Sequence, residues 1–397
     1  MEDGLTIGGE RAPGTRRSFL ALGAAALSAG CQTSWPSGGD RAPTTTVECD
    51  TSGGWTQFQA DAANTGVCGR RAPSMDANST ELAEVTERSG GVVADGGGRV
   101  FVVDQQDVWA LDAAEASESW RRSFDSLVAT TPLLLCDALV VQTSIKTCAL
   151  DSATGETLWE ASPGNQFADP VSDGRHAYIA AGVPTALDLR DGSTMWTHEL
   201  SGVSPWGCCL ADETVVVAGE RDDGGALVGL DAASGERQWR TDFGNPVKTS
   251  PTDDDGTVYV PDMWGDVYAV TAATGTVEWQ TAVYEQLPSG RRSPTPTVVD
   301  GTVVVPSGNA RRSVGLNAAS GTEEWQLKTG PTLAPALCTE SGIVMGTMNE
   351  GLFLVGESGS VSDNRADTRV ASQMALTDDG LFFKAYGREL SLSHLPV

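Results

Sequence analysis

The fold is decided by residues 149–159, which read Ala149-Leu150-Asp151-Ser152-Ala153-Thr154-Gly155-Glu156-Thr157-Leu158-Trp159. Their frame is a small residue, then Asp two positions later, Gly after four more and Trp after another four. The frame recurs at intervals of roughly 40 residues, a period typical of stacked structural repeats. Its tryptophans are Trp120, Trp159, Trp196, Trp239, Trp279 and Trp325, and its aspartates are Asp112, Asp151, Asp188 and Asp231.

Each copy of the frame follows a second repeating feature, two short apolar runs joined by an acidic turn. Asp173-Gly174 and Asp300-Gly301 are such turns. An Asp-Gly pair between β-branched runs marks a tight hairpin, and the frame then supplies two further strands. Four short antiparallel strands in roughly 40 residues make one blade of a β-propeller. The sequence therefore predicts an all-β propeller of four-stranded antiparallel blades.

The number of blades follows from the six copies of the frame and from two degenerate units after them. A seventh unit spans 334–363 and has Asp363 where Trp would stand, and an eighth begins near Ala371 and lacks a fourth strand. Pairing of residues 81–88 with this last blade would close the ring and remove both sheet edges. We therefore expect an eight-bladed ring over residues 54–397, with seven blades as the alternative.

The residue types of the frame have physical reasons. Gly adopts positive φ in a turn without steric cost, and Asp accepts hydrogen bonds from the backbone of the same turn. The small residue is expected to let a Trp from a neighbouring blade lie flat on the strand. Each buried Trp removes on the order of 200 Å² from water. We therefore assign the six tryptophans to contacts between blades rather than to ligand stacking.

Acidic residues outnumber basic ones along the whole chain. The net charge is −27, and the lysines are few: Lys146, Lys248, Lys328 and Lys384. Such a surface repels the phosphates of DNA and RNA, which argues against nucleic acid binding. An Asp-rich, Lys-poor chain that keeps Arg resembles the proteins of halophilic archaea, where salt screens the self-repulsion. The alternative is an acidic protein of a mesophile.

The N-terminal residues read as an export signal. Arg16 and Arg17 precede an apolar run from Phe19 to Ala29, which is the pattern of a twin-arginine (Tat) signal. The small residues before Cys31 resemble a lipobox, so lipid attachment to Cys31 is expected. The alternative is an ordinary Tat signal in which Cys31 is incidental.

These features predict three parts of the chain. Residues 1–31 form the Tat signal peptide with its lipobox cysteine. Residues 32–53 are rich in Ser, Gly, Pro and Thr and form a flexible tether. Residues 54–397 form the propeller, anchored by its lipid to the outer face of the cell membrane.

Cysteines other than Cys31 can form disulfides, because an exported chain meets an oxidising environment. Cys49 with Cys68, and Cys136 with Cys148, are the pairs that the sequence suggests. The number left after Cys31 is odd, so at least one is free or pairs between chains. The chain has no Cys-x-x-Cys pair and three His residues, so no zinc site is predicted.

The repeated frame resembles the tryptophan-docking motif of the pyrroloquinoline quinone (PQQ)-like repeat propellers. The opening Trp55-Thr56-Gln57-Phe58 also resembles the entry segment of such proteins, and the resemblance covers residues 54–397. The family includes quinoprotein alcohol dehydrogenases and the outer-membrane assembly lipoprotein BamB. The resemblance therefore implies a propeller that is either an enzyme or a scaffold.

An enzyme of this family would hold PQQ and a calcium ion near the central axis. The resemblance draws attention to Cys208-Cys209, because such dehydrogenases carry a vicinal disulfide against the cofactor. No other matching ligand set occurs in order. Asp253–Asp255 falls at a hairpin turn and lacks the ligand spacing of an EF-hand. Gly96–Gly98 lacks the Lys and Ser/Thr of a phosphate loop.

We therefore expect a scaffold that binds a protein or a surface polymer, and an enzyme is the less favoured hypothesis. The three scattered His residues, His176, His198 and His394, support no Ser/His/Asp set. No catalytic, cofactor-binding or metal-binding residue is predicted, and no cofactor. The alternative is a PQQ- and calcium-dependent quinoprotein oxidoreductase.

Overall fold

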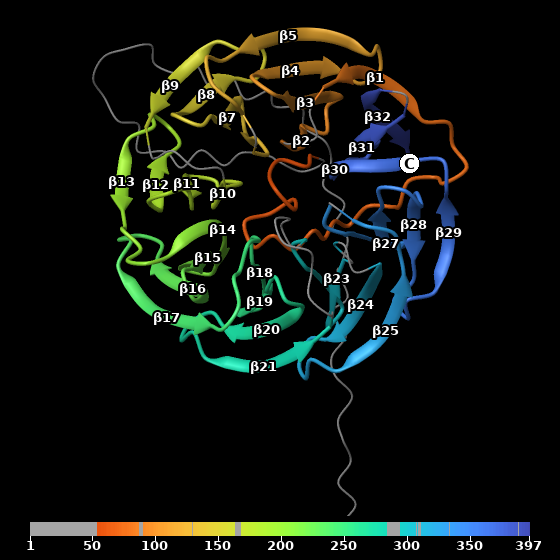
Figure 1. The fold of residues 1–397 in the computed structure, drawn as a ribbon. Helices are drawn as coiled ribbons and strands as arrows, with labels where there is room; N and C mark the ends of the chain where they lie inside the picture. The colour runs from red at the N-terminus through yellow and green to blue at the C-terminus, as the bar shows by residue number, and fades with distance from the viewer. Residues whose placement is uncertain are drawn as a thin grey trace, which may run out of the picture. The chain divides into compact units, whose positions relative to one another are not determined.

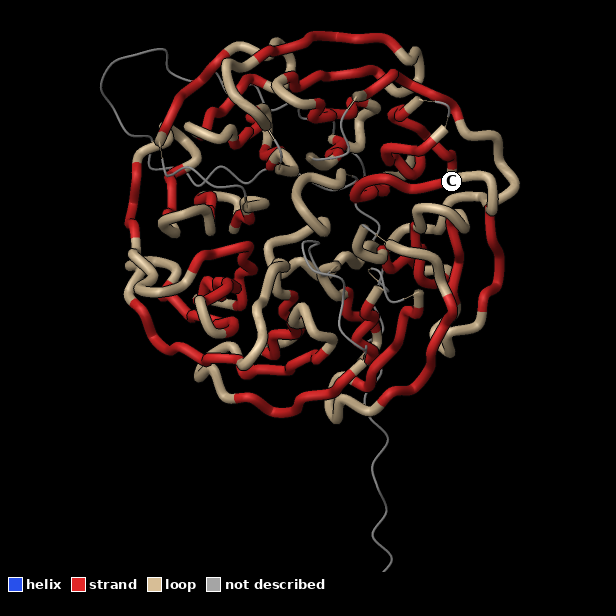
Figure 2. The backbone as a smooth tube through the Cα atoms, viewed as in Figure 1, coloured by secondary structure: helices blue, strands red, loops and turns tan. Residues whose placement is uncertain are grey.

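The computed structural model describes residues 54–86, 90–128, 130–162, 168–283, 294–306, 308, 311–332, 334–387 and 389–397. Their strands form eight four-stranded antiparallel sheets arranged around one axis (Figure 1). The described residues contain strands and loops but no helix, as Figure 2 shows, so none of them forms a helix able to span a membrane. The expected eight-bladed all-β propeller is confirmed.

Each blade begins with a strand at the axis and continues outward through three more strands. Blades 1 to 4 contain, from the axis outward, β2 (Val92–Ala94), β3 (Arg99–Asp104), β4 (Asp107–Asp112) and β5 (Ser117–Ser123); β6 (Leu133–Leu135), β7 (Ala138–Gln142), β8 (Thr147–Asp151) and β9 (Thr157–Ala161); β10 (Val171–Ser172), β11 (His176–Ile179), β12 (Thr185–Asp188) and β13 (Thr194–Thr197); β14 (Ser204–Ala211), β15 (Thr214–Arg221), β16 (Gly224–Asp231) and β17 (Arg237–Phe243).

Blades 5 to 8 have the same order. They contain β18 (Thr252–Asp254), β19 (Thr257–Pro261), β20 (Asp266–Thr271) and β21 (Val277–Ala282); β22 (Thr297–Val299), β23 (Thr302–Val305), β24 (Arg312–Asn317) and β25 (Glu323–Lys328); β26 (Leu337–Thr339), β27 (Gly342–Gly346), β28 (Leu352–Val355) and β29 (Val361–Arg365); β30 (Arg369–Leu376), β31 (Gly380–Tyr386), β32 (Leu390–Pro396) and β1 (Thr80–Val85).

The ring is closed by the first strand of the chain. β1 pairs antiparallel with β32, with Glu81 opposite Ser393 and Val85 opposite Leu390. β1 is thereby the outer strand of blade 8. The sequence placed the closing segment at about 81–88, and the strand lies at 80–85. Because the two ends of the propeller share one sheet, they leave no gap in the ring.

Neighbouring blades are joined by the tryptophans of the frame. Trp196 of blade 3 lies on Gly235, in the turn between the third and fourth strands of blade 4, where an added Cβ would lie 2.5 Å from the indole. Its Nε1 donates to the carbonyl oxygen of Ala232 at 2.8 Å. The φ of Gly235 is +72°, a conformation that suits glycine. The same two contacts recur for Trp120, Trp159, Trp239 and Trp279.

The small residue of the frame has a different role from the expected one. It is the cross-strand partner of the Trp of its own blade, as Gly229 is of Trp239. An added Cβ at Gly229 would lie 2.2 Å from that indole. The expectation that it receives a Trp from the neighbouring blade was wrong, because the indole lies over its own third strand before it reaches the next blade. Each indole is held between a small residue of its own blade and a Gly of the next blade.

The frame changes where no tryptophan arrives. Blade 8 ends in β1, which carries no Trp, and blade 1 accordingly has Ala116 in place of the turn Gly, at a φ of +50°. Blade 7 has Asp363 in place of its own Trp, yet it keeps Gly359, which receives Trp325 from blade 6. A turn Gly is therefore present where the preceding blade supplies a Trp, whether or not its own blade has one.

The expected disulfides within the described residues do not form. Cys68, Cys148, Cys208, Cys209 and Cys338 are free thiols, whereas Cys136 is disulfide-bonded, so its partner lies outside the described residues. The suggested pairs Cys136–Cys148 and Cys49–Cys68 were wrong. Cys148 points into the buried core between blades, whereas Cys136 lies in a turn at a φ of +50°, so the two side chains do not face each other.

We expect Trp196→Ala to destabilise the propeller by about 3–5 kcal/mol, because it removes a buried aromatic ring and leaves a cavity. Trp264→Ala is the matched control, since this ring is 51% exposed and truncation of a surface side chain changes stability by about 0.5 kcal/mol or less. Denaturant unfolding followed by circular dichroism measures both variants. Equal unfolding midpoints would contradict the interface role of Trp196.

Candidate functional site

Residues 54–70, which we term the plug, run across the axis of the ring before the chain enters β1 (Figure 1). The plug turns back on itself through Gln59, Ala60 and Asn64, all of which have positive φ. The N–H of Gly66 donates to the carbonyl of Gln59 at 3.0 Å and fixes this loop. The plug therefore has a defined backbone conformation at the place where the eight inner strands converge.

The first residues of the plug bind blades 1 to 3 in succession. Trp55 exchanges two backbone hydrogen bonds with Ala94 at the end of β2, at 2.8 and 2.9 Å. The carbonyl of Thr56 accepts from the N–H of Leu134 in β6 at 2.6 Å. The side-chain oxygen of Gln57 accepts from the backbone N–H of β10 at 3.0 Å. Each inner strand thus gains a hydrogen-bond partner on the side that faces the axis.

The middle of the plug continues around the ring to blades 4, 5 and 6. The carbonyl oxygens of Ala62 and Ala63 accept from the backbone N–H groups of β14 and β18, at 2.7 and 2.9 Å. The fully buried amide of Asn64 donates to carbonyls of both blades, Cys208 at 2.8 Å and Pro251 at 2.9 Å. The amide of Gln59 lies 3.4 Å from the hydroxyl of Thr297 in blade 6.

The end of the plug completes the circuit at blades 7 and 8. The N–H of Cys68 donates to the carbonyl of Cys338 at 3.0 Å, and the N–H of Cys338 donates to Gly66 at 2.8 Å. Arg70 donates to the carbonyl of Leu376 in β30 at 3.3 Å and pairs with Asp378 at 3.1 Å. The plug therefore forms hydrogen bonds with all eight blades.

The plug fills one end of the axis, at the C-terminal ends of the inner strands. We term this end of the ring the turn face, because the first and third turns of each blade, such as 95–98 and 152–156, lie there. The first turn of every blade carries a carboxylate, so the turn face repels other acidic surfaces. These carboxylates are Asp95, Asp137, Asp173, Asp212, Asp255, Asp300, Glu340 and Asp378.

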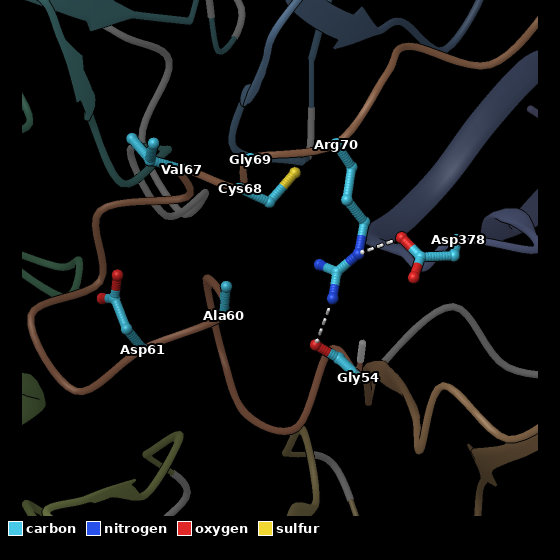
Figure 3. A pocket seen from close by; sticks show the side chains of 8 residues that line it. All are labelled: Gly54, Ala60, Asp61, Val67, Cys68, Gly69, Arg70 and Asp378. Atoms are coloured by element: carbon cyan, nitrogen blue, oxygen red, sulfur yellow. Dashed lines mark hydrogen bonds and ion pairs between the residues drawn. The ribbon is translucent and has the colours of Figure 1, made fainter. Parts of the chain in front are cut away.

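A cavity of about 390 Å³ opens beside the plug. Arg70 projects toward Asp378 and toward the carbonyl of Gly54, on the opposite side of the cavity from Asp61 (Figure 3). These bonds already engage the guanidinium, so its main effect is to tie the plug to blade 8. The residues that line the cavity are Gly54, Ala60, Asp61, Val67, Cys68, Gly69, Arg70 and Asp378.

Comparison with known proteins identifies the family to which the chain belongs. The sequence profile of the outer membrane protein assembly factor BamB matches residues 54–182 and 180–334, more than half of the chain. The chain belongs to the BamB family. The serine/threonine-protein kinase AfsK of Streptomyces coelicolor is 33% identical over 170 residues, which are 40% of this chain. The chain spans only 20% of the length of that kinase.

Solved structures share the fold of this BamB-family chain at low sequence identity. BamB from Moraxella catarrhalis is 17% identical, with a TM-score of 0.62 over 80% of this chain and 98% of that one. A europium-containing methanol dehydrogenase is 13% identical, with a TM-score of 0.69 over 85% and 90% of the two chains. The quinohemoprotein alcohol dehydrogenase of Comamonas testosteroni is 12% identical, with a TM-score of 0.69 over 88% and 81%.

Two carboxyl groups of the BamB-family chain, one in the plug and one beside it, lie in environments that disfavour their charged form. Burial raises the pKa of Asp61, although hydrogen bonds from Thr65 oppose the rise. Burial raises the pKa of Asp253 to about 7, and the charges of Asp212, Asp254 and Asp255 add to the effect. Among the described residues, Oδ1 of Asp253 is buried without a hydrogen-bond partner. Asp253 and Asp254 thus end β18, only Asp255 lies in the hairpin turn, and the carboxyl group of Asp253 is pressed into the interior.

Cys208 and Cys209 do not face a common site. They are consecutive residues of β14, paired in regular register with Val217 and Val216, so their side chains point to opposite faces of the sheet. Cys208 packs in the core shared with blade 3, and Cys209 packs in the core shared with blade 5. Burial raises the pKa of both thiols. Their environment is that of inert structural cysteines.

The other residues singled out in the sequence are spread over the blades. Gly96–Gly98 form the first turn of blade 1, where Asp95 accepts the N–H of Gly97 at 2.8 Å. His176 of blade 3 lies 2.9 Å from Asp173, and His394 stacks on Phe382 in blade 8. The frame tryptophans lie between blades, and Cys31 falls outside the described residues.

Sequence reasoning missed two features of the site. The repeat pattern contains no information about the plug, which is not a repeat, although the resemblance marked Trp55–Phe58 as an entry segment. Sequence reasoning also passed over Trp264, which lies outside the plug and is 51% exposed. Its position outside the repeated frame does not single it out, because Trp55 and Trp109 also lie outside the frame and are buried.

Asp253 predicts how stability depends on pH. Its pKa of about 7 lies above the value of about 4 for Asp in unfolded chains, so between these values the folded chain binds more protons. The stability that this site contributes is full below about pH 4 and is lost as the pH rises to about 7. Asp253→Asn should therefore match the wild type in acid and exceed its stability at pH values above the folded pKa.

Denaturant midpoints of the wild type and Asp253→Asn, measured across this pH range in concentrated salt, test the expectation. Asp379→Asn, at an exposed position of a corresponding turn, is the control and should show no such difference. A stability gain of Asp253→Asn that stays the same at every pH would show that the carboxyl does not titrate as its burial implies.

Proposed function

We propose that the chain is an extracytoplasmic, lipid-anchored propeller that acts as a scaffold for binding proteins or for surface assembly. Membership of the BamB family supports this proposal, because the family is named for a protein assembly factor. The plug is the observation that carries it furthest. It fills one end of the axis with the chain's own backbone, so the ring is a rigid body that offers its faces and rim to partners.

The second candidate function is a PQQ- and calcium-dependent oxidoreductase. The likeness of the fold to the methanol and alcohol dehydrogenases favours it. The residues do not fit such a site, however, since Cys208 and Cys209 face different cores. Across the ranges that the structure describes, no three His, Cys, Asp or Glu side chains stand together as ligands of a metal ion would. We derive no chemical step through PQQ, and no cofactor is proposed.

Affinity capture of the full chain from its native membrane, in concentrated salt, tests the scaffold. We expect specific proteins or surface polymers to be retained by the propeller and not by residues 1–53 fused to an unrelated acidic protein. Capture of nothing beyond this control would contradict the scaffold. Titration of the purified chain with PQQ and calcium tests the alternative, because a stoichiometric shift in visible absorbance would show a cofactor site.

Lipid anchoring makes a separate prediction. Cys31→Ser removes the thiol that would carry the lipid and leaves the twin arginines in place, so we expect the exported chain to move from the membrane fraction to the medium. Replacing Arg16 and Arg17 by Lys is the control, and it should keep the chain inside the cell. Immunoblots of the fractions measure both. Membrane retention of Cys31→Ser would show that Cys31 is not the anchor.

A further inference from the structure

Trp264 has the most exposed aromatic side chain in the described part of the ring, at 51% of its surface. It belongs to the connection 262–265 between β19 and β20. This connection lies on what we term the loop face, the end of the ring opposite the turn face, together with connections such as 244–251. Burying a Trp stabilises a fold by several kcal/mol, so a chain that exposes one forgoes that gain. Blade packing does not account for Trp264.

The turn that carries Trp264 is rigid. Asp262 is fully buried beneath it. Oδ1 of Asp262 accepts the backbone N–H groups of Trp264, Gly265 and Asp266, at 2.8 to 3.0 Å. Oδ2 accepts from the hydroxyl of Tyr268 at 3.2 Å. A buried carboxylate with this many partners fixes the backbone, so the point from which the Trp264 side chain projects is preorganised and the turn loses little entropy when a partner binds.

A second tryptophan lies on the same face in blade 4. Lys248 Nζ lies 5.1 Å from the centre of the Trp206 ring and pairs with Glu220 at 2.6 Å. Lys248 belongs to the connection 244–251, which is bonded to the turn of Trp264: the amide of Asn245 donates to Asp262 at 2.9 Å. Trp206 with its bound lysine therefore shows, in this same surface, the cation–aromatic contact that the exposed Trp264 can offer to a partner.

Exposed carboxylates lie on the same face of the ring, in blade 4. Asp222 and Asp223 form the exposed connection between β15 and β16. The strand after them lies against the connection 244–251, since an added Cβ at Gly225 would lie 2.5 Å from the carbonyl of Asn245. Asp223 pairs with Arg221 at 2.6 Å, whereas Asp222 has no ion-pair partner among the described residues. The surface therefore combines an indole exposed on a rigid turn with a carboxylate that has no ion-pair partner among the described residues.

The geometry points to this surface as a docking site for a cationic polypeptide segment, one that places Arg or Lys on Trp264 and a second basic side chain against Asp222. We term it the tryptophan surface, formed by Trp206, Glu220, Asp222, Asp223, Lys248 and Trp264. The inference rests on the proposed scaffold function and names the chemistry of its partner. Charge complementarity selects the occupant, because a chain of net charge −27 attracts cationic partners and repels acidic ones.

The two kinds of contact respond differently to salt. Attraction between exposed charges is screened within roughly 3 Å at 1 M salt, so the carboxylates act mainly in dilute salt. A cation that stacks on an indole is in close contact and also buries apolar surface, so this part of the binding persists. The tryptophan surface therefore suits a partner that must be recognised where long-range electrostatics are weak.

A fluorescently labelled peptide of alternating Arg and Ser, with a Glu counterpart, tests the inference on the full chain by fluorescence anisotropy. We expect the Arg peptide to bind and the Glu peptide not to bind. Trp264→Ala should weaken binding about three- to fivefold in both dilute and concentrated salt, as loss of an exposed cation–aromatic contact would. Asp222→Asn should weaken it in dilute salt only. Ile145→Ala removes a comparably exposed side chain from the same face, at 55%, and should change nothing.

Equal affinity of wild type, Trp264→Ala and Ile145→Ala for the Arg peptide would overturn the inference. Binding of a neutral oligosaccharide that depends on Trp264, without peptide binding, would also overturn it and mark a saccharide site. Capture from the native membrane separates this inference from the scaffold. If wild type and Trp264→Ala retain the same partners equally, the scaffold function stands and this surface is excluded. If the wild type captures nothing, the scaffold function is contradicted, and the peptide assay still decides whether this surface binds cationic segments.

Discussion

The ring depends on an indole held between a small residue of its own blade and a glycine of the next. Trp196 shows the arrangement: its ring covers Gly235, and its N–H reaches the carbonyl of Ala232. The hydrogen bond fixes the orientation of the ring, and the missing Cβ sets the distance between the blades. Because each Trp acts on the next blade, the same contact repeated around the axis sets both the spacing and the rotation from blade to blade.

The sequence predicted the part of the fold that repeats. Blade number, strand order and the place of the tryptophans follow from a frame that six blades carry and from the two degenerate units after them. The partner of the small residue was assigned to the wrong blade, because a pattern along the chain does not distinguish a neighbour across a strand from one across an interface. Position 116 points to the correct assignment: it is Ala and not Gly, and it lies in the blade whose preceding blade has no Trp.

The candidate site was much less predictable. The plug binds the eight blades through backbone groups and through the side chains of Gln57, Gln59, Asn64 and Arg70, and backbone hydrogen bonds leave no signature in residue type. Cys208 and Cys209 appeared as a pair in the sequence, yet alternation along a strand sends them into different cores. The exposure of Trp264 could not be predicted from the frame, because Trp55 and Trp109 also lie outside it and are buried.

The pairing of β1 with β32 has a consequence for how the protein comes into being. Residues 80–85 are made long before their partners at 390–396, so the ring stays open until blade 8 has been made. The plug shares this delay, because its last bonds are to blades 7 and 8. Contacts that join distant parts of a chain form slowly, and until then blade 8 lacks its outer strand. A ring that is closed by two such distant segments forms only after all eight blades have been made, which suits the twin-arginine route that we propose, since that route carries proteins that have already folded.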